Sequence, residues 1–143
     1  MRALGIDLGT KRIGVAVSDR SGTIASPLTV VARSGRIADD HRRIAALVAE
    51  EEAELVVVGL PRSMDGSDGP AARGARREAA QLATVVAVPV ETYDERLSTV
   101  SAERVLRESG VRGQARRQVV DMVAAAVILQ AWLDARRSRS AEQ

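Results

Sequence analysis

Residues 3–18 read ALGIDLGTKRIGVAVS, and this stretch decides the fold. Within it, residues 3–9 and residues 12–18 each alternate apolar with small or polar side chains at a period of two, which is typical of β-strands. Only Thr10 and Lys11 separate the two runs. The spacing therefore predicts a β-hairpin at the start of the chain.

Asp7 is the first candidate functional residue. Alternation along the first predicted strand puts it on the same face as Gly5 and Gly9. A carboxylate flanked by glycines leaves room beside it for a bulky ligand. The alternative is an aspartate that only hydrogen-bonds the hairpin turn. The turn also supplies three groups that could contact a phosphate, on Thr10, Lys11 and Arg12.

The rest of the chain alternates between strand and helix patterns. The periodicity predicts a strand over 23–33, a helix over 36–52, a buried strand over 55–60, a Gly-rich loop over 61–70, a helix over 71–84, a strand near a sheet edge over 86–93, and helices over 99–109 and 114–135. This order predicts an α/β fold, a mixed sheet with helices on its faces. We expect one domain over residues 1–135 and a flexible C-terminal tail over 136–143.

The composition excludes several classes of function. A chain of 143 residues with 45% hydrophobic and 28% charged residues fits a single globular domain. With no cysteine and one histidine, His41, the chain lacks disulfides, thiolate nucleophiles and His or Cys metal clusters. We expect His41 to be a packed structural residue. A bound metal would need oxygen ligands, which favours Mg²⁺ or Mn²⁺.

No membrane span or leader segment is expected. The longest apolar runs fall well short of the roughly 18 residues that a span needs, and the chain begins directly with a strand pattern. We therefore expect a cytoplasmic protein without membrane contacts.

The charge distribution suggests a polyanionic partner. The formal net charge is +2, yet residues 96–143 carry nine arginines against five acids, directly after an acidic cluster over 91–95. This pattern favours a polyanion approached through a bound cation, and an ordinary solvated surface is the alternative. With no Phe, one Tyr and one Trp, the chain lacks platforms for stacking bases, so nucleic acid would be recognised through phosphates and shape.

Asp121 is the second informative acid, because it is the only charged residue over 119–133. Helical spacing places it in line with an apolar stripe that should pack on the sheet, formed by Ala124, Ala125, Ile128 and Trp132. A carboxylate there needs a counterion. Its partner could be Arg116 or Arg117, or a divalent metal shared with Asp7.

A third acidic site, Asp94-Glu95-Arg96, follows the last predicted strand. Adjacent strand residues point to opposite faces, so only one of the two acids can lie beside Asp7. Turn chemistry alone would also explain this tripeptide. Together, however, carboxylates from the first strand, the end of the last strand and the terminal helix could hold one or two Mg²⁺ ions for phosphoryl transfer. Arg62, in the loop over 59–67 at the end of a strand, suits a substrate rim, although an ordinary connection is equally compatible.

Five motifs carry a resemblance to a known family. They are GIDLGTKRIGVAVSD at 5–19, VGLP at 58–61, MDGS at 64–67, DERLST at 94–99, and VD at 120–121 followed by Ala124 and Ala125. In order and spacing they resemble the YqgF/RuvX family, pre-16S ribosomal RNA nucleases related to Holliday junction resolvases. The resemblance covers about residues 3–133, and Ser98 stands where the family commonly has threonine.

The resemblance implies a ribonuclease H-like fold, with five strands in a mixed sheet whose first three are antiparallel. It implies a nuclease that uses Mg²⁺ or Mn²⁺ in 5′-end maturation of the 16S ribosomal RNA precursor. It maps the catalytic acids onto Asp7, the pair Asp94 and Glu95 with Glu95 preferred as ligand, and Asp121. The phosphate-binding residues would be Thr10, Lys11, Arg12, Arg62 and Arg96.

Alternative functions remain open at this stage. The resemblance leaves the substrate open between precursor RNA and branched DNA, so a Holliday junction resolvase is one alternative. Another is a non-catalytic RNA-binding factor that assembles ribosomal particles. The GIDLGT motif also resembles the phosphate loop of actin-like ATPases and sugar kinases, but those enzymes clamp ATP between two such domains and we expect one here. The chain could act as a monomer or as a homodimer.

Overall fold

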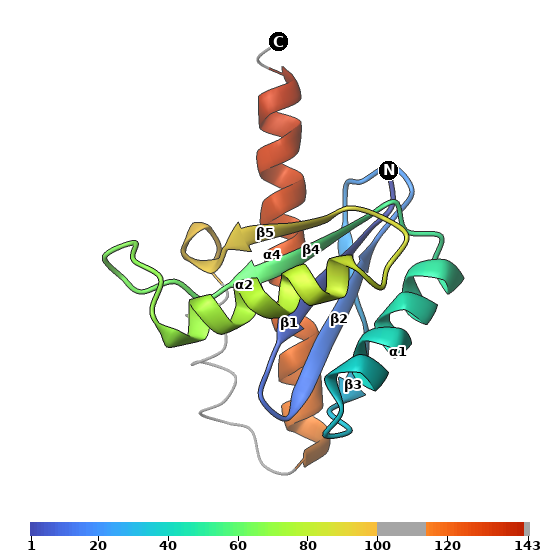
Figure 1. Cartoon of the computed structure of the whole chain (residues 1–143). Helices are drawn as coiled ribbons and strands as arrows, with labels where there is room; N and C mark the ends of the chain where they lie inside the picture. Colours follow the sequence, from blue (N-terminus) through green and yellow to red (C-terminus); the bar gives the residue numbers. More distant parts are fainter. Residues whose placement is uncertain (100–113, 142–143) are drawn as a thin grey trace.

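The computed structural model describes residues 1–99 and 114–141. Its elements in chain order are β1 (Ala3–Leu8), β2 (Arg12–Ser18), β3 (Ala25–Ala32), α1 (Ile37–Glu50), β4 (Leu55–Leu60), α2 (Pro70–Ala83), β5 (Val90–Asp94), the short 3₁₀ helix η1 (Glu95–Leu97) and α4 (Gln114–Ala141). The strands form one sheet in the order β3-β2-β1-β4-β5 (Figure 1). The β1–β2 and β2–β3 pairs are antiparallel, whereas β4 pairs in parallel with both β1 and β5. The expected mixed α/β sheet is confirmed.

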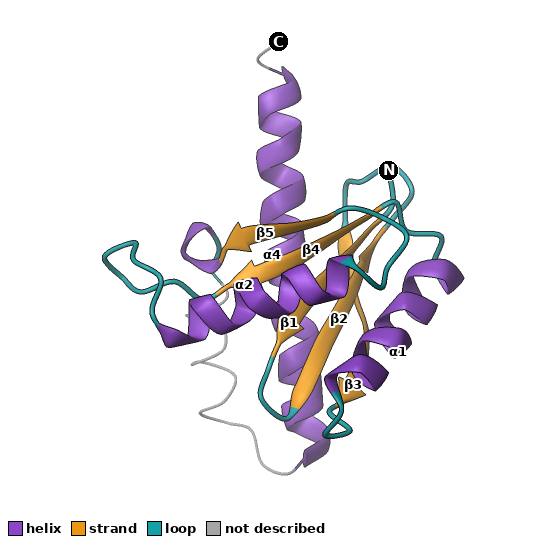
Figure 2. Cartoon of the chain, viewed as in Figure 1, coloured by secondary structure: helices purple, strands orange, loops and turns teal. Residues whose placement is uncertain are grey.

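Helices cover both faces of the sheet, with α1 and α2 on one face and α4 on the other (Figure 2). Alternation along β1 explains both layers. Leu4 and Ile6 belong to the apolar core beneath α1 and α2, whereas Ala3 belongs to the core beneath α4. The period-two pattern of the sequence therefore assigns each β1 side chain to its layer.

The terminal helix α4 packs unusually close to the sheet. A Cβ atom added to Gly5 would lie 2.7 Å from Cβ of Leu129, so only a glycine fits under the helix there. The apolar stripe expected on this helix is confirmed, because its members are all buried against the sheet: Ala124, Ala125, Ile128 and Trp132. Trp132 also donates from Nε1 to a carboxylate oxygen of Glu91 in β5, at 3.1 Å.

Two element boundaries differ from the expectation by more than two residues. Strand β5 begins at Val90 rather than at 86, because Pro89 has no N–H and offers only its carbonyl to Val56. Helix α4 continues to Ala141, beyond the end expected at 135, because residues 136–141 contain neither glycine nor proline to end the helix. The segment over 136–143, for which a flexible tail is expected, is thus helical as far as Ala141. The helix expected over 99–109 lies almost wholly outside the described residues.

Across residues 1–99 and 114–141, none of the helices has the length and apolar character needed to cross a membrane.

Candidate active site

Asp7 lies near the carboxyl end of β1 with a glycine on each side. In the hairpin it is paired with Gly14 of β2. The parallel register pairs Ile6 with Val58, and one residue further it brings Gly59 of β4 beside Asp7. Asp7 is only 5% exposed. A buried carboxylate is costly, so its position between two residues without side chains makes Asp7 a candidate functional group.

The carboxylate of Glu95 lies over one of these glycines. A Cβ atom added to Gly59 would be 3.0 Å from Oε1 of Glu95 and 2.6 Å from Cδ1 of Ile128 in α4. Glu95 therefore occupies the face of the sheet that α4 covers, which is also the face of Asp7. Neighbouring strands are about 4.8 Å apart, so the two acids belong to one small region.

The backbone of Asp121 lies over the other glycine. A Cβ atom added to Gly14 would overlap the carbonyl oxygen of Asp121. The first turns of α4 therefore bring Asp121 to the β2 side of Asp7, while Glu95 occupies the β4 side. Glu95 and the backbone of Asp121 thus lie on the two sides of Asp7, and they come from elements far apart in the chain.

The side chain of Asp121 forms an ion pair with Arg12 of β2. Nε of Arg12 donates to Oδ2 of Asp121 at 2.7 Å, and both side chains are less than a fifth exposed. The sequence pointed to Arg116 or Arg117 as the protein partner, but their side chains lie outside the described part of the chain. Arg12 therefore forms an ion pair with one of the candidate acids, in addition to its predicted role of contacting phosphates.

Asp94 takes a different position from Glu95. It accepts hydrogen bonds from Nη2 of Arg96 at 2.6 Å and is 3.5 Å from Nη1 of Arg62. The hydrogen bond from Arg96, aided by the charge of Arg62, holds the pKa of Asp94 below its ordinary value against the opposing effect of partial burial. Asp94 therefore organises two arginines at the edge of the site.

The loop that carries Arg62 is held by its own hydrogen bonds. Arg62 donates to the carbonyl of Gly66 and to Asp68, the latter at 3.0 Å from Nε. The backbone N–H of Ser63 donates to the carbonyl of Ser67 at 3.0 Å. These contacts give the loop a defined shape, in contrast to the flexible connection that the sequence left open.

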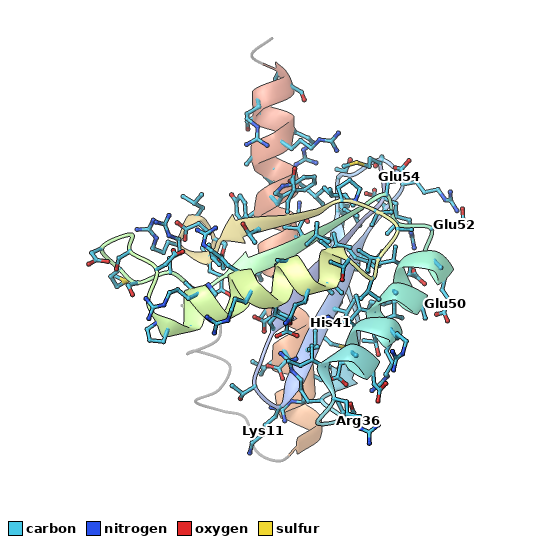
Figure 3. All side chains as sticks on the ribbon, viewed as in Figure 1. Lys11, Arg36, His41, Glu50, Glu52 and Glu54 are labelled. Carbon is cyan, nitrogen blue, oxygen red and sulfur yellow. The ribbon has the colours of Figure 1, made fainter. Side chains whose placement is uncertain are left out.

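Thr10 and Lys11 are exposed at the tip of the β1–β2 hairpin, and Figure 3 shows the Lys11 side chain extending from that tip. They lie three and four residues beyond Asp7. An ammonium group in this position can reach a phosphate that approaches the acids.

The acids fit a hard divalent cation by their chemistry. All three offer only carboxylate oxygens, the ligands that Mg²⁺ and Mn²⁺ prefer. Among the described residues, however, no three Asp, Glu, His or Cys side chains already stand close enough to hold an ion. Asp121 would have to turn from Arg12 to complete a set of three.

Sequence reasoning missed a second charged group, which joins α1, α2 and the end of β3 on the face of the sheet opposite α4. His41 is buried, as expected of a structural residue, but its Nε2 lies 2.8 Å from Oε2 of Glu78 in α2, which also binds Arg33. No local pattern links these residues, because they come from three separate segments. Only the tertiary fold reveals them.

The comparisons with known proteins agree on one family. The model of the RuvX family, described as a Holliday junction resolvase, matches residues 1–135. A protein of Myxococcus xanthus named "Putative pre-16S rRNA nuclease" is 52% identical over 137 residues, which cover 96% of this chain and 90% of the relative. A protein of Anaeromyxobacter sp. with the same name is 52% identical over 138 residues, which cover 96% of this chain and 100% of the relative.

A solved structure supports the same assignment at the level of the fold. RuvC of T. thermophilus, in a complex with a Holliday junction substrate, superposes with a TM-score of 0.58 at 21% identity, covering 96% of each chain. At this identity the likeness concerns the fold alone, and it confirms the expected ribonuclease H-like architecture. Together with the family match and the two relatives, it shows that the chain belongs to the RuvX family of nucleases.

Proposed function

We propose that this chain is a nuclease dependent on Mg²⁺ or Mn²⁺ that hydrolyses phosphodiester bonds in the 5′-end maturation of the 16S ribosomal RNA precursor. The names of its relatives support the RNA substrate. Nucleic acid, including ribosomal particles, is the proposed partner. The proposal includes a cytoplasmic location, where such a substrate is made.

The observation that carries the proposal is the position of Asp7. It is a buried carboxylate between two glycines, with Glu95 over one glycine and Asp121 over the other. In the proposal, Asp7, Glu95 and Asp121 would hold one or two ions. When bound, the ions would activate the attacking water and stabilise the leaving oxygen.

The remaining residues would bind and orient the substrate. Arg12 would hold the side chain of Asp121 through their ion pair until the ions bind. Lys11 and Thr10 would contact a phosphate at the hairpin tip. Arg62 and Arg96, both bound to Asp94, would present guanidinium groups to the phosphates that flank the scissile bond. Asp94 is proposed as a positioning residue rather than a metal ligand.

The test compares the unmodified protein with Asp7→Asn. Each is incubated with Mg²⁺ or Mn²⁺, a labelled 16S precursor RNA fragment and a four-way DNA junction. We expect the unmodified protein to cleave the RNA and Asp7→Asn to bind it with similar affinity without cleaving it. Asp39→Asn is the matched control, because Asp39 is a partly exposed acid on α1 that forms a local ion pair with Arg42.

Three results would change the proposal. Cleavage of the junction alone would make the protein a resolvase, for which a symmetric dimer is the natural form. Binding of RNA without cleavage under any metal condition would make it a non-catalytic assembly factor. Full activity in Asp7→Asn would remove Asp7 from the active site.

A further inference from the structure

Arg33, directly after β3, forms a bidentate ion pair with Glu78 of α2. Nη1 of Arg33 is 2.7 Å from Oε2 of Glu78, and Nη2 is 2.9 Å from Oε1. The same carboxylate contacts Nε2 of His41 in α1 at 2.8 Å. The three side chains are 17%, 13% and 2% exposed, in the order Arg33, Glu78, His41.

Burial of this group is difficult to explain by stability alone. Removing charges from water costs several kcal/mol per ion, and well-packed apolar residues often stabilise such a position equally well. The contacts with Arg33 and His41 hold the pKa of Glu78 below its ordinary value despite its burial, so the carboxylate stays ionised. This group, the Arg33–Glu78–His41 anchor, therefore connects α1, α2 and the end of β3 through directional polar contacts.

The anchor holds the turn that follows Asp7. Nε of Arg33 donates to the carbonyl of Gly9 at 3.0 Å, and the backbone N–H of Arg33 donates to the carbonyl of Lys11 at 3.0 Å. The turn has little freedom of its own, because a Cβ atom on Gly9 would overlap the carbonyl of Arg12. Arg33 thus fixes the turn at two points.

We infer that Arg33, held in place by Glu78 and His41, is a positioning residue for the nuclease site. It fixes the turn between β1 and β2. Asp7 lies just before this turn, and Arg12, the ion-pair partner of Asp121, lies just after it. The inference rests on the proposed nuclease function. Displacements of about 1 Å in a catalytic group can lower a rate about a hundredfold, so a fixed turn bears directly on the rate.

The decisive variant is Arg33→Lys. Lysine keeps the positive charge, but its single ammonium cannot bind both oxygens of Glu78 and the carbonyl of Gly9 in the geometry of a guanidinium. Arg2→Lys is the matched control. Arg2 forms a similar ion pair with Glu51, at 2.8 Å with both side chains 24% exposed, at the opposite end of β1.

Amide hydrogen exchange over residues 9–12 tests the anchor directly, without any assay of cleavage. We expect exchange at least tenfold faster in Arg33→Lys and unchanged in Arg2→Lys. In cleavage of the 16S precursor RNA fragment with Mg²⁺, we expect kcat to fall about tenfold in Arg33→Lys, with KM within twofold. In Arg2→Lys both kcat and KM should stay within twofold of the values for the unmodified protein. This should hold even if the Tm of Arg2→Lys falls by as much as that of Arg33→Lys.

Glu78→Gln provides a second, nearly isosteric test and covers the case in which Arg33→Lys does not fold. It should reproduce the faster exchange and the lower kcat. Because His41 is the only histidine, its imidazole NMR signals should also shift in Glu78→Gln and stay in place in Arg2→Lys.

Several results would overturn the inference. The inference fails if kcat falls in proportion to Tm in both Arg33→Lys and Arg2→Lys, because the loss of activity is then explained by the loss of stability. It also fails where exchange at the turn stays slow, or where exchange accelerates while kcat is unchanged. Absence of cleavage in the unmodified protein would instead refute the proposed function, and exchange would still show whether Arg33 holds the turn.

Discussion

Glu95 and Asp94 are adjacent residues with different surroundings, and we expect them to have different roles. Glu95 lies over Gly59 on the face of Asp7, whereas Asp94 binds Arg62 and Arg96. We expect Glu95→Gln to abolish cleavage with RNA affinity retained, because the change removes a carboxylate from the site. Asp94→Asn should keep measurable kcat and raise KM severalfold, because it releases the two arginines.

Steady-state cleavage and RNA binding by both variants would test this division. Loss of all cleavage in Asp94→Asn, together with full activity in Glu95→Gln, would mean that Asp94 rather than Glu95 is the acid needed for cleavage. The sequence alone indicates that only one of Asp94 and Glu95 can lie beside Asp7. The point at which β5 ends places Glu95 rather than Asp94 over Gly59, and that point depends on pairing with β4 rather than on local sequence.

Asp19 gives a prediction about pH. Backbone N–H groups of Thr23 and Ile24, with the hydroxyl of Ser21, lower its pKa to about 2. A carboxyl whose pKa is lower in the folded state stabilises the fold above its ordinary pKa of about 3.9, and this stabilisation is lost as the pH falls toward the folded value. Part of the stability lost between pH 4 and pH 2 should therefore come from Asp19.

The urea midpoint of Asp19→Asn should change less between pH 4 and pH 2 than that of the unmodified protein. At pH 6 the variant should be the less stable of the two. Parallel pH profiles would show that the loop before β3 does not depend on the ionised Asp19.

At the scale of elements, the packing of α4 on β2 depends on a missing side chain. A Cβ atom on Gly14 would overlap the carbonyl of Asp121, so Gly14→Ala must push the helix outward. We expect a loss of about 1–3 kcal/mol in the free energy of unfolding, as for other overpacked sites, together with lower activity. Urea denaturation and the cleavage assay measure both.

Gly74 in α2 is the control for Gly14. The nearest heavy atom to a Cβ at Gly74 lies 4.0 Å away, in the side chain of Arg77. Gly74→Ala should therefore increase stability by about 0.5–1 kcal/mol, because alanine favours a helix. Equal destabilisation by the two substitutions would mean that close packing under α4 is not the cause.

Most elements were predictable because their patterns are local. The alternation over 3–18 located β1, β2 and the face of Asp7, and the apolar run over 55–60 located β4. The contacts that complete the site were not predictable in this way. Arg12 and Asp121 are 109 residues apart, and Arg33 and Glu78 are 45 apart, so no periodicity within a single element relates them.

At the scale of the whole molecule, a group of three glutamates and the only lysine of the sequence lie at opposite ends of the sheet. Glu50, Glu52 and Glu54 lie at the end where β4 begins, and Lys11 lies at the opposite end (Figure 3). A polyanion should therefore approach from the end that carries the candidate site.

Lys11→Ala should weaken RNA binding and reduce the slope of log K against log salt by about 0.7–0.9, the effect of one lost phosphate contact. Arg20→Ala is the control, because Arg20 is exposed at the acidic end and lies 3.8 Å from Glu52. Equal effects of the two substitutions on the salt slope would mean that RNA does not prefer the Lys11 end. Binding titrations at several salt concentrations provide the measurement.

The outer strand β3 carries a consequence of a different kind. Its pairing with β2 is irregular, with an extra residue on β3 where the register shifts between Val15 and Ala16, and it contains Pro27, which has no N–H to offer. Exposed sheet edges are templates on which further chains can add strands and aggregate, and a bulge and a proline both interrupt such a template. The open edge of this sheet therefore resists fibrillar association between copies of the chain, which helps to keep a small protein dispersed at high concentration.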